Sequence, residues 1–391
     1  MFKPDRLVTS VAITLLCSAA PASAALIDLT GIGYAQYGDG LSYSMPFANY
    51  QVTGDATPQP GDPFYIASSP GQIASLVVPG TGVNGGPVTI NFAGMDDAFQ
   101  TPDGNAEGNF FQTGGLSFGG NNYLGSDPNG PGEFTGDEAN TWDATLASLR
   151  DFLAGDQMVF FFNNNQFNTT SNEQSLAAWA QLWITDGSGN VVDPDGAGPE
   201  SGYFEFTNDD SPYALISEGG GGILVGDPTS FISAGRTAPG GDANTTDYVL
   251  SGGGLCLDAA DNVVSCSGGS AVLGPVNHNL GANNAAYAVV FPELNGLMDS
   301  LIANTLLDLN EYTLHMDVRL GCDPTLFGTD PDAVSCNGGV GGWGKNLTNG
   351  YEQIFMATLA RPQFSVPEPG VLALLGMGLA GLALARRRRA S

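Results

Sequence analysis

The feature that most constrains the fold is a series of short apolar or alternating runs separated by glycine-rich segments. Residues 88–92 and 314–320 alternate between apolar and polar side chains, which is typical of half-buried strands. Residues 158–162 are continuously apolar and predict a central strand covered on both faces. The 56 glycines lie mostly between such runs, where they favour tight turns. Further strands are predicted at residues 178–185, 203–207, 223–225, 248–250, 287–291 and 353–359.

Two helices are predicted among these strands. Asp143 favours the N-terminus of the first and Gly155 is placed to end it, while Pro292 suits the first turn of the second. Their apolar stripes are Trp142, Leu146, Leu149 and Leu153, and Leu294, Leu297, Met298, Leu301 and Ile302. Many short strands with few helices predict an all-β dominated ectodomain, a β-sandwich or jelly-roll. The glycine-rich stretch 219–254 is a possible seam within it.

The last 26 residues place an extended strip, an apolar run and a basic cluster in immediate succession. Two prolines fix the backbone around Glu368, so its carboxylate is displayed on a non-helical strip. Residues 371–385 can enter a bilayer as a helix, and the basic cluster at 386–389 stops it at an anionic cytoplasmic face. The strip contains Val366, Pro367, Glu368 and Pro369, and the cluster is Arg386, Arg387, Arg388 and Arg389.

This order of segments resembles the PEP-CTERM sorting signal of Gram-negative bacteria. The resemblance covers residues 366–391 only and implies exosortase, a multi-pass membrane transpeptidase or protease, as a partner. The alternative is an ordinary stop-transfer anchor. A plain span needs about 20 apolar residues, whereas residues 371–385 supply fifteen, three of them glycine. Retention in the inner membrane is therefore marginal, which suits a transient anchor that is cut later.

The N-terminal end predicts export. Lys3 and Arg6 precede an apolar stretch at residues 7–20, and Ala22 and Ala24 are the small residues of a cleavage site. The sequence thus predicts a signal peptide at 1–24, an ectodomain at 25–365 and a sorting segment at 366–391. Together with the cytoplasmic arginines, the signal peptide orients the ectodomain outside the inner membrane.

The predicted ectodomain is strongly acidic. It keeps five of the 11 basic residues and 38 of the 40 acidic residues, a formal charge of −33. Such a field repels nucleic acid and attracts divalent cations, so no nucleic-acid partner is expected. A hydrophobic content of 42% nevertheless allows a packed core.

Four cysteines remain once the signal peptide is removed: Cys256, Cys266, Cys322 and Cys336. An even count in an exported chain predicts disulfides, and four cysteines allow three pairings. Proximity in sequence favours Cys256–Cys266 and Cys322–Cys336. A metal site is disfavoured because the chain contains no C-x-x-C pair.

One acidic loop predicts a calcium site. Asp186, Asn190, Asp193 and Asp195 offer hard oxygen donors within ten residues that also contain glycines. Their spacing does not match an EF-hand, and the alternative is an ordinary turn between strands. Calcium is the one cofactor that the sequence suggests.

No catalytic residue is predicted, and the chain is expected not to be an enzyme. His315, Asp317 and Arg319 share one face of a strand, and an ordinary solvent-exposed face is the favoured interpretation. His278 is interpreted as a loop residue rather than a base. No G-x-S-x-G or H-E-x-x-H motif is present.

Two functional hypotheses follow. What the resemblance implies is a non-catalytic protein of the cell surface or extracellular matrix, associated with exopolysaccharide and biofilm and cut by an exosortase. The alternative is a secreted carbohydrate-binding or hydrolytic protein, with calcium as a cofactor.

Overall fold

The computed structural model describes residues 27–68, 77–82, 91–101, 111–113, 132–166, 176–194, 202–207, 215–217, 222–223, 249–260, 263–264, 266, 270–281, 284–321, 347 and 352–359. The predicted signal peptide, the sorting segment, Cys322, Cys336, Asp195 and most of the possible seam at 219–254 lie outside these residues. Within them, no helix has the length and apolar character needed to cross a membrane.

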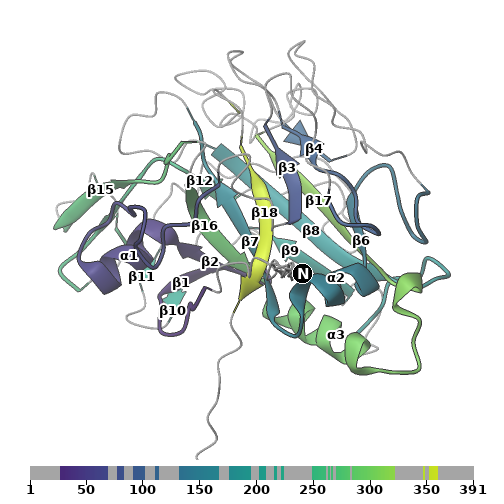
Figure 1. The fold of residues 1–391 in the computed structure, drawn as a ribbon. Helices are drawn as coiled ribbons and strands as arrows, with labels where there is room; N and C mark the ends of the chain where they lie inside the picture. The colour runs from purple at the N-terminus through teal and green to yellow at the C-terminus, as the bar shows by residue number, and fades with distance from the viewer. Residues whose placement is uncertain are drawn as a thin grey trace, which may run out of the picture.

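The fold is dominated by sheets, as the sequence predicts. The largest sheet has nine strands in the order β11-β10-β1-β2-β16-β7-β18-β3-β4, antiparallel except for the β3–β4 pair (Figure 1). Its strands are β1 Tyr34–Tyr37, β2 Gly40–Ser44, β3 Val77–Thr81, β4 Phe99–Gln100, β7 Gln157–Asn163, β10 Leu215–Ser217, β11 Gly222–Ile223, β16 Ala285–Val290 and β18 Ile354–Leu359.

A second sheet of six strands is built around the β8–β17 pair. β17 lies beside β8 along its whole length, and its other edge pairs with β5 and β6. The six strands are β5 Phe111–Gln112, β6 Trp142–Thr145, β8 Leu176–Thr185, β9 Tyr203–Phe206, β12 Val249–Ser251 and β17 Thr313–Leu320. A small third sheet has the order β14-β13-β15, with bounds β13 Gly254–Leu257, β14 Val263–Val264 and β15 Leu273–Asn277.

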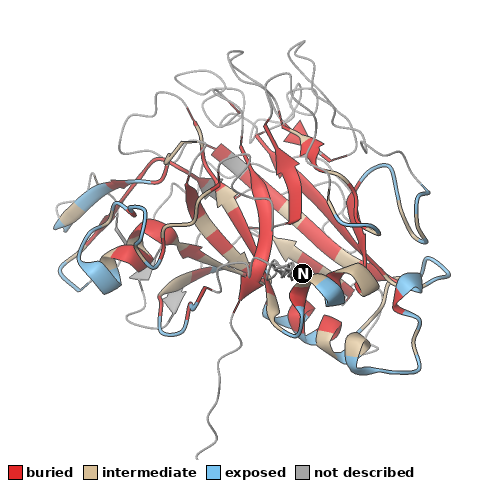
Figure 2. Ribbon diagram, viewed as in Figure 1, coloured by how far each residue is buried: buried red, intermediate tan, exposed pale blue. Residues whose placement is uncertain are grey.

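Two apolar cores lie on opposite faces of the large sheet, and Figure 2 shows the central strands of this sheet as buried. Phe160 of β7 points into the core shared with the second sheet, to which Leu182 and Met316 also belong. Val159 and Phe161, the neighbours of Phe160, point into the other core. The continuous apolar run at 158–162 is therefore a central strand covered on both faces, as predicted.

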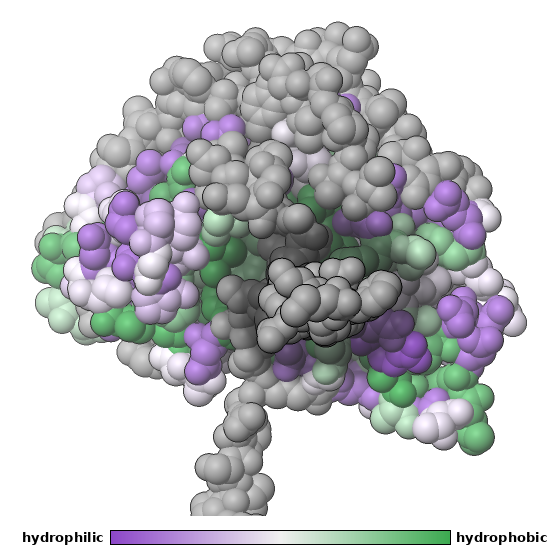
Figure 3. All heavy atoms as spheres, viewed as in Figure 1, coloured by the Kyte–Doolittle hydropathy of each residue, from purple (hydrophilic) through white to green (hydrophobic). Residues whose placement is uncertain are grey.

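Three α-helices flank the sheets: α1 Met45–Thr53, α2 Leu146–Leu153 and α3 Pro292–Ala303; a short 3₁₀ helix, η3, spans Leu309–Glu311. α2 and α3 pack their apolar side chains on the core between the sheets. α1 covers the other core and was not predicted. Its signals are local: a Ser44 cap, Pro46 in the first turn and the left-handed Gly54 at its end. Figure 3 shows hydrophilic residues over α1 on the left flank and hydrophobic residues near α3 at the lower right.

Two sequence predictions about these elements are wrong. Trp142 and Asp143 do not begin α2 but lie in β6, and Thr145 caps the helix by accepting a hydrogen bond from Ser148 N. The strand pairing of β6 with β17 outcompetes an earlier helix start. Residues 91 and 92 of the predicted strand 88–92 are not in a strand, and its first three residues lie outside the described chain.

The predicted Cys256–Cys266 disulfide is present and closes a loop across the β13–β14 turn. We expect its removal in a Cys256→Ser/Cys266→Ser variant to lower the free energy of unfolding by roughly 2–3 kcal/mol, because the unfolded chain regains the entropy of an open loop. Urea unfolding of oxidised wild type and variant measures the difference. Equal midpoints and slopes would contradict the expectation.

Candidate functional site

The polar face of β17 is buried, which corrects the interpretation of His315, Asp317 and Arg319 as a solvent-exposed face. His315 and Asp317 have no exposed surface and Arg319 keeps 4%. The alternation in the sequence correctly placed the three on one face of the strand. It did not reveal that both faces of β17 are covered, because a period of two says nothing of what lies above the sheet.

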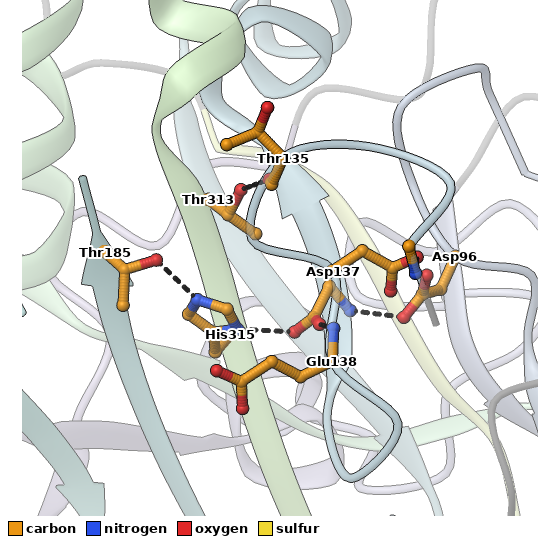
Figure 4. Close-up of polar contacts among 9 residues, drawn as sticks. Asp96, Thr135, Asp137, Glu138, Thr185, Thr313 and His315 are labelled. Atoms are coloured by element: carbon orange, nitrogen blue, oxygen red, sulfur yellow. Dashed lines mark hydrogen bonds and ion pairs between the residues drawn. The ribbon is translucent and has the colours of Figure 1, made fainter. Parts of the chain in front are cut away.

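His315 is held between a carboxylate and a hydroxyl (Figure 4). Its Nδ1 lies 2.8 Å from Asp143 Oδ1, and its Nε2 lies 2.8 Å from Thr185 Oγ1. The strand register produces this arrangement, because His315 pairs directly with Asp143 on β6 and lies diagonal to Thr185 on β8. The imidazole also stacks on Trp183, with ring centroids 5.2 Å apart.

The order carboxylate, imidazole, hydroxyl is that of an acyl-transfer triad. Asp143 and His315 have no exposed surface, however, and Thr185 keeps 4%. A substrate carbonyl cannot reach Thr185 Oγ1 in this arrangement, because the hydroxyl and both of its partners in the row are buried. The three residues therefore stabilise the junction of β6, β17 and β8.

Three carboxylates converge beside His315: Asp96, Asp137 and Asp143 (Figure 4). One oxygen from each lies within 4.8 Å of the others. Asp96 Oδ2 accepts from Asp143 N at 2.7 Å, and Asp137 Oδ2 accepts from Gly132 N and Glu133 N, both at 2.7 Å. An oxygen-only donor set of this kind suits Ca²⁺ chemically. The sequence did not indicate this grouping, because Asp96 and Asp143 come together only through the fold.

Asp317 and Arg319 continue the buried row along β17. Thr113 Oγ1 donates to Asp317 Oδ1 at 3.0 Å, and Arg319 Nη2 lies 3.7 Å from Asp317 Oδ2. The guanidinium sits 4.9 Å from the ring centre of Trp179, a cation–π distance. These contacts compensate two charges that burial would otherwise penalise.

The same face of the second sheet carries a half-buried aromatic pair. Trp183 and Tyr203 lie side by side on β8 and β9, with ring centroids 5.6 Å apart. Beside them, Gln181 Nε2 donates to Glu205 Oε1. Desolvation, assisted by the charge of Glu138, raises the pKa of the Tyr203 phenol, which keeps it a hydrogen-bond donor. Flat rings with amide and carboxylate groups thus gather in one place.

The loop predicted to bind calcium forms a hydrogen-bonded turn after β8. Asp186 Oδ1 accepts from Ser188 N and Asn190 N, both at 2.9 Å, and the Asn190 amide points its nitrogen at Asp186. The bond from Asn190 N is the main reason that the pKa of Asp186 is lowered. Asp193 follows the turn, and Asp195 lies outside the described residues. Calcium at these four residues stays a prediction.

Two family models match the chain. The one described as Domain of unknown function (DUF8239) matches residues 26–319, and the one described as PEP-CTERM protein-sorting motif matches residues 365–389. No curated protein and no solved structure matches. The second match confirms the resemblance of the tail and marks an exported, membrane-transiting precursor with exosortase as its processing partner. The first covers well over half of the 391 residues, so the chain belongs to the family described as Domain of unknown function (DUF8239).

Proposed function

We propose that this chain is a protein of the cell surface or extracellular matrix, cut by an exosortase at its tail, whose sheet-rich body binds exopolysaccharide. The observation that carries the delivery step is the match of the PEP-CTERM motif to residues 365–389. The alternative of a plain stop-transfer anchor predicts no cut. The tail thus accounts for how the body reaches the cell exterior.

The aromatic pair supports polymer binding by the body. Sugar rings have flat apolar faces and a rim of hydroxyls, and partly exposed aromatic rings beside amide and carboxylate groups complement both. Trp183 and Tyr203 supply the rings and the half-buried Glu205 supplies a carboxylate, which the buried Gln181 amide holds in place. The ectodomain carries far more acidic than basic residues, so a neutral polysaccharide is favoured over an anionic one.

Replacing Glu368 by alanine tests the delivery step. The exosortase has to read the displayed Pro367-Glu368-Pro369 strip, so we expect the variant to stay uncut in the inner-membrane fraction while wild type loses its C-terminal segment. Blotting of cell fractions and the intact mass of the recovered protein measure this. Glu293→Ala, an exposed change in the body, serves as the control and should be cut normally. Equal processing of wild type and Glu368→Ala would contradict recognition of this strip by an exosortase and would favour the ordinary stop-transfer anchor.

Replacing Trp183 by alanine tests polymer binding separately. We expect retention on immobilised neutral polysaccharide to fall at least tenfold, because the larger ring of the pair is lost. The matched control is Phe92→Ala, since Phe92 is 49% exposed but lies elsewhere on the surface. Equal losses in the two variants, or no retention of wild type on any polymer tested, would contradict the proposed role of this face.

A further inference from the structure

A cavity of about 130 Å³ lies between the two large sheets, lined almost entirely by apolar side chains. Its walls come from strands of both sheets and from Phe47 of α1. A cavity of roughly 150 Å³ in another protein admits benzene, so this one has room for an apolar group of about six carbons. One of the few hydroxyls in its wall belongs to Ser44, which is half-buried.

Ser44 is in contact with a histidine that stands behind the cavity wall. Its Oγ lies 2.7 Å from His278 Nε2, although 234 residues separate the two in sequence. Strand β2 ends at Ser44 and α1 begins at the next residue, so the hydroxyl stands at a sharp strand-to-helix junction. Phe47 N donates to the same Oγ at 3.1 Å, which fixes its position.

The imidazole of His278 is oriented to act as a base. Its Nδ1 lies 3.0 Å from the Val276 carbonyl oxygen, which can only accept; Nδ1 therefore carries the proton and Nε2 is left to accept from Ser44. Burial lowers the pKa of His278 to about 4, so the ring is neutral at physiological pH. Tyr287 stacks on the ring and Phe47 packs edge-on against it. Burial raises the pKa of the Tyr287 phenol, which therefore stays neutral as well.

Helix α1 places its positive end beside Ser44, although Pro46 has no N–H and Phe47 N already donates to Ser44 Oγ. The backbone N–H groups in the first turn of a helix have no partner within the helix, and they carry its positive end. Met45 N directly follows the serine at this end. A negative oxygen developing on a substrate carbonyl at Ser44 would meet this positive region.

We propose that Ser44 and His278 form a serine-hydrolase site that cleaves carboxylic esters with a short apolar acyl group seated in the cavity. Ser44 Oγ bonds to the carbonyl carbon while its proton passes to His278 Nε2. The ester C–O bond then breaks, and the alcohol leaves with that proton. Water next attacks the acyl-serine, gives a proton to His278 and releases the carboxylic acid as the proton returns to Ser44. This activity goes beyond the proposed function, does not rest on it, and departs from the expectation of no enzyme.

The test uses the exported protein purified from culture. A short-chain alkyl fluorophosphonate is the probe: Ser44 Oγ bonds to phosphorus, fluoride leaves, and peptide mass spectrometry locates the adduct. We expect the adduct on Ser44 in folded protein and none after unfolding in urea. Hydrolysis of p-nitrophenyl butyrate should exceed that of the dodecanoate at least tenfold. Its rate should be half-maximal near pH 4, where His278 becomes neutral, and level through pH 7.

Variants separate catalysis from folding, because Ser44 also caps α1. Ser44→Asn keeps a capping oxygen but has no nucleophile, and it should abolish hydrolysis without loss of the folded state by circular dichroism. His278→Gln should slow labelling of Ser44 at least a hundredfold. Ser300→Ala on α3, where the hydroxyl bonds only its own helix, should leave both readouts unchanged. Absence of the adduct from folded wild type, or ester hydrolysis that persists in Ser44→Asn, would overturn the proposal.

Discussion

Replacing Asp143 by alanine is expected to lower the free energy of unfolding by about 1–3 kcal/mol, because it leaves a buried donor without its acceptor. The carboxylate has no exposed surface and accepts from His315 Nδ1 at 2.8 Å and from Glu138 N at 2.6 Å. Alanine leaves the fully buried His315 Nδ1 without an acceptor and removes the acceptor of Glu138 N. Desolvation of such groups is not recovered on folding, so the cost falls on the native state.

Asp151→Ala is the matched control for this change. Asp151 pairs with Arg150 at 2.7 Å, but its side chain is 72% exposed. Exposed pairs of this kind contribute about 0–1 kcal/mol. Urea unfolding of wild type and both variants measures the difference, and an Asp143→Ala/His315→Ala double variant gives the coupling between the buried pair. A loss no larger than that of Asp151→Ala would show that the buried network does not stabilise the fold.

The second large effect is a loss of stability with rising pH that depends on Glu352. This side chain has no exposed surface, and burial raises its pKa from 4.5 to about 8, although backbone N–H groups of Glu352 and Asn165 act in the opposite direction. Between these two values the native state binds a proton that the unfolded state has lost. Stability therefore falls as pH rises from 4.5 towards 8, by at most roughly 1.4 kcal/mol per pH unit, and is level above that.

His278 acts with the opposite sign in a lower window. Its pKa is lowered from 6.5 to about 4, so the unfolded state binds the extra proton and stability rises with pH across that interval. The two contributions oppose each other between pH 4.5 and 6.5, and of these two groups only Glu352 contributes between 6.5 and 8. That upper interval is where the Glu352 effect is best measured.

Glu352→Gln isolates the contribution of Glu352. Glutamine is similar in size and does not titrate, so we expect the stability of the variant relative to wild type to rise by at most about 2 kcal/mol between pH 6.5 and 8. Urea unfolding at half-unit intervals gives the difference, in which the other titrating groups cancel. Glu293→Gln, an exposed change, should show no such trend. A difference between wild type and Glu352→Gln that is constant with pH would contradict the assignment.

The sequence predicted most of the strands because their signal is local. Alternation and apolar runs located β7, β8, β17 and β18 to within two residues, and the stripe of α3 was read correctly. The helix start at Asp143 was wrong, because the pairing of β6 with β17 is a contact across 172 residues at Asp143 and His315. Helix and strand propensities are read from neighbouring residues, so they cannot predict a contact between residues this far apart in sequence.

The site residues were harder to predict for the same reason. The Ser44–His278 pair forms when β2 meets the loop after β15, and neither residue lies in a recognisable motif. The burial of the polar face of β17 depends on segments far away in sequence. By contrast, the sorting motif is a continuous stretch of sequence that does not depend on long-range contacts, so the residues alone were enough to predict it.

The position of β18 has a consequence for how this chain matures during export. β18 is the last described strand, yet it lies between β7 and β3 in the interior of the large sheet. Six residues separate its end at Leu359 from Val366. β7 and β3 each pair with β18, which is the last of these strands to be translocated. The large sheet therefore cannot form completely until nearly the whole polypeptide has crossed the membrane. Release of the chain before β18 has paired with β7 and β3 would leave an incomplete sheet with exposed strand edges, which is prone to aggregation.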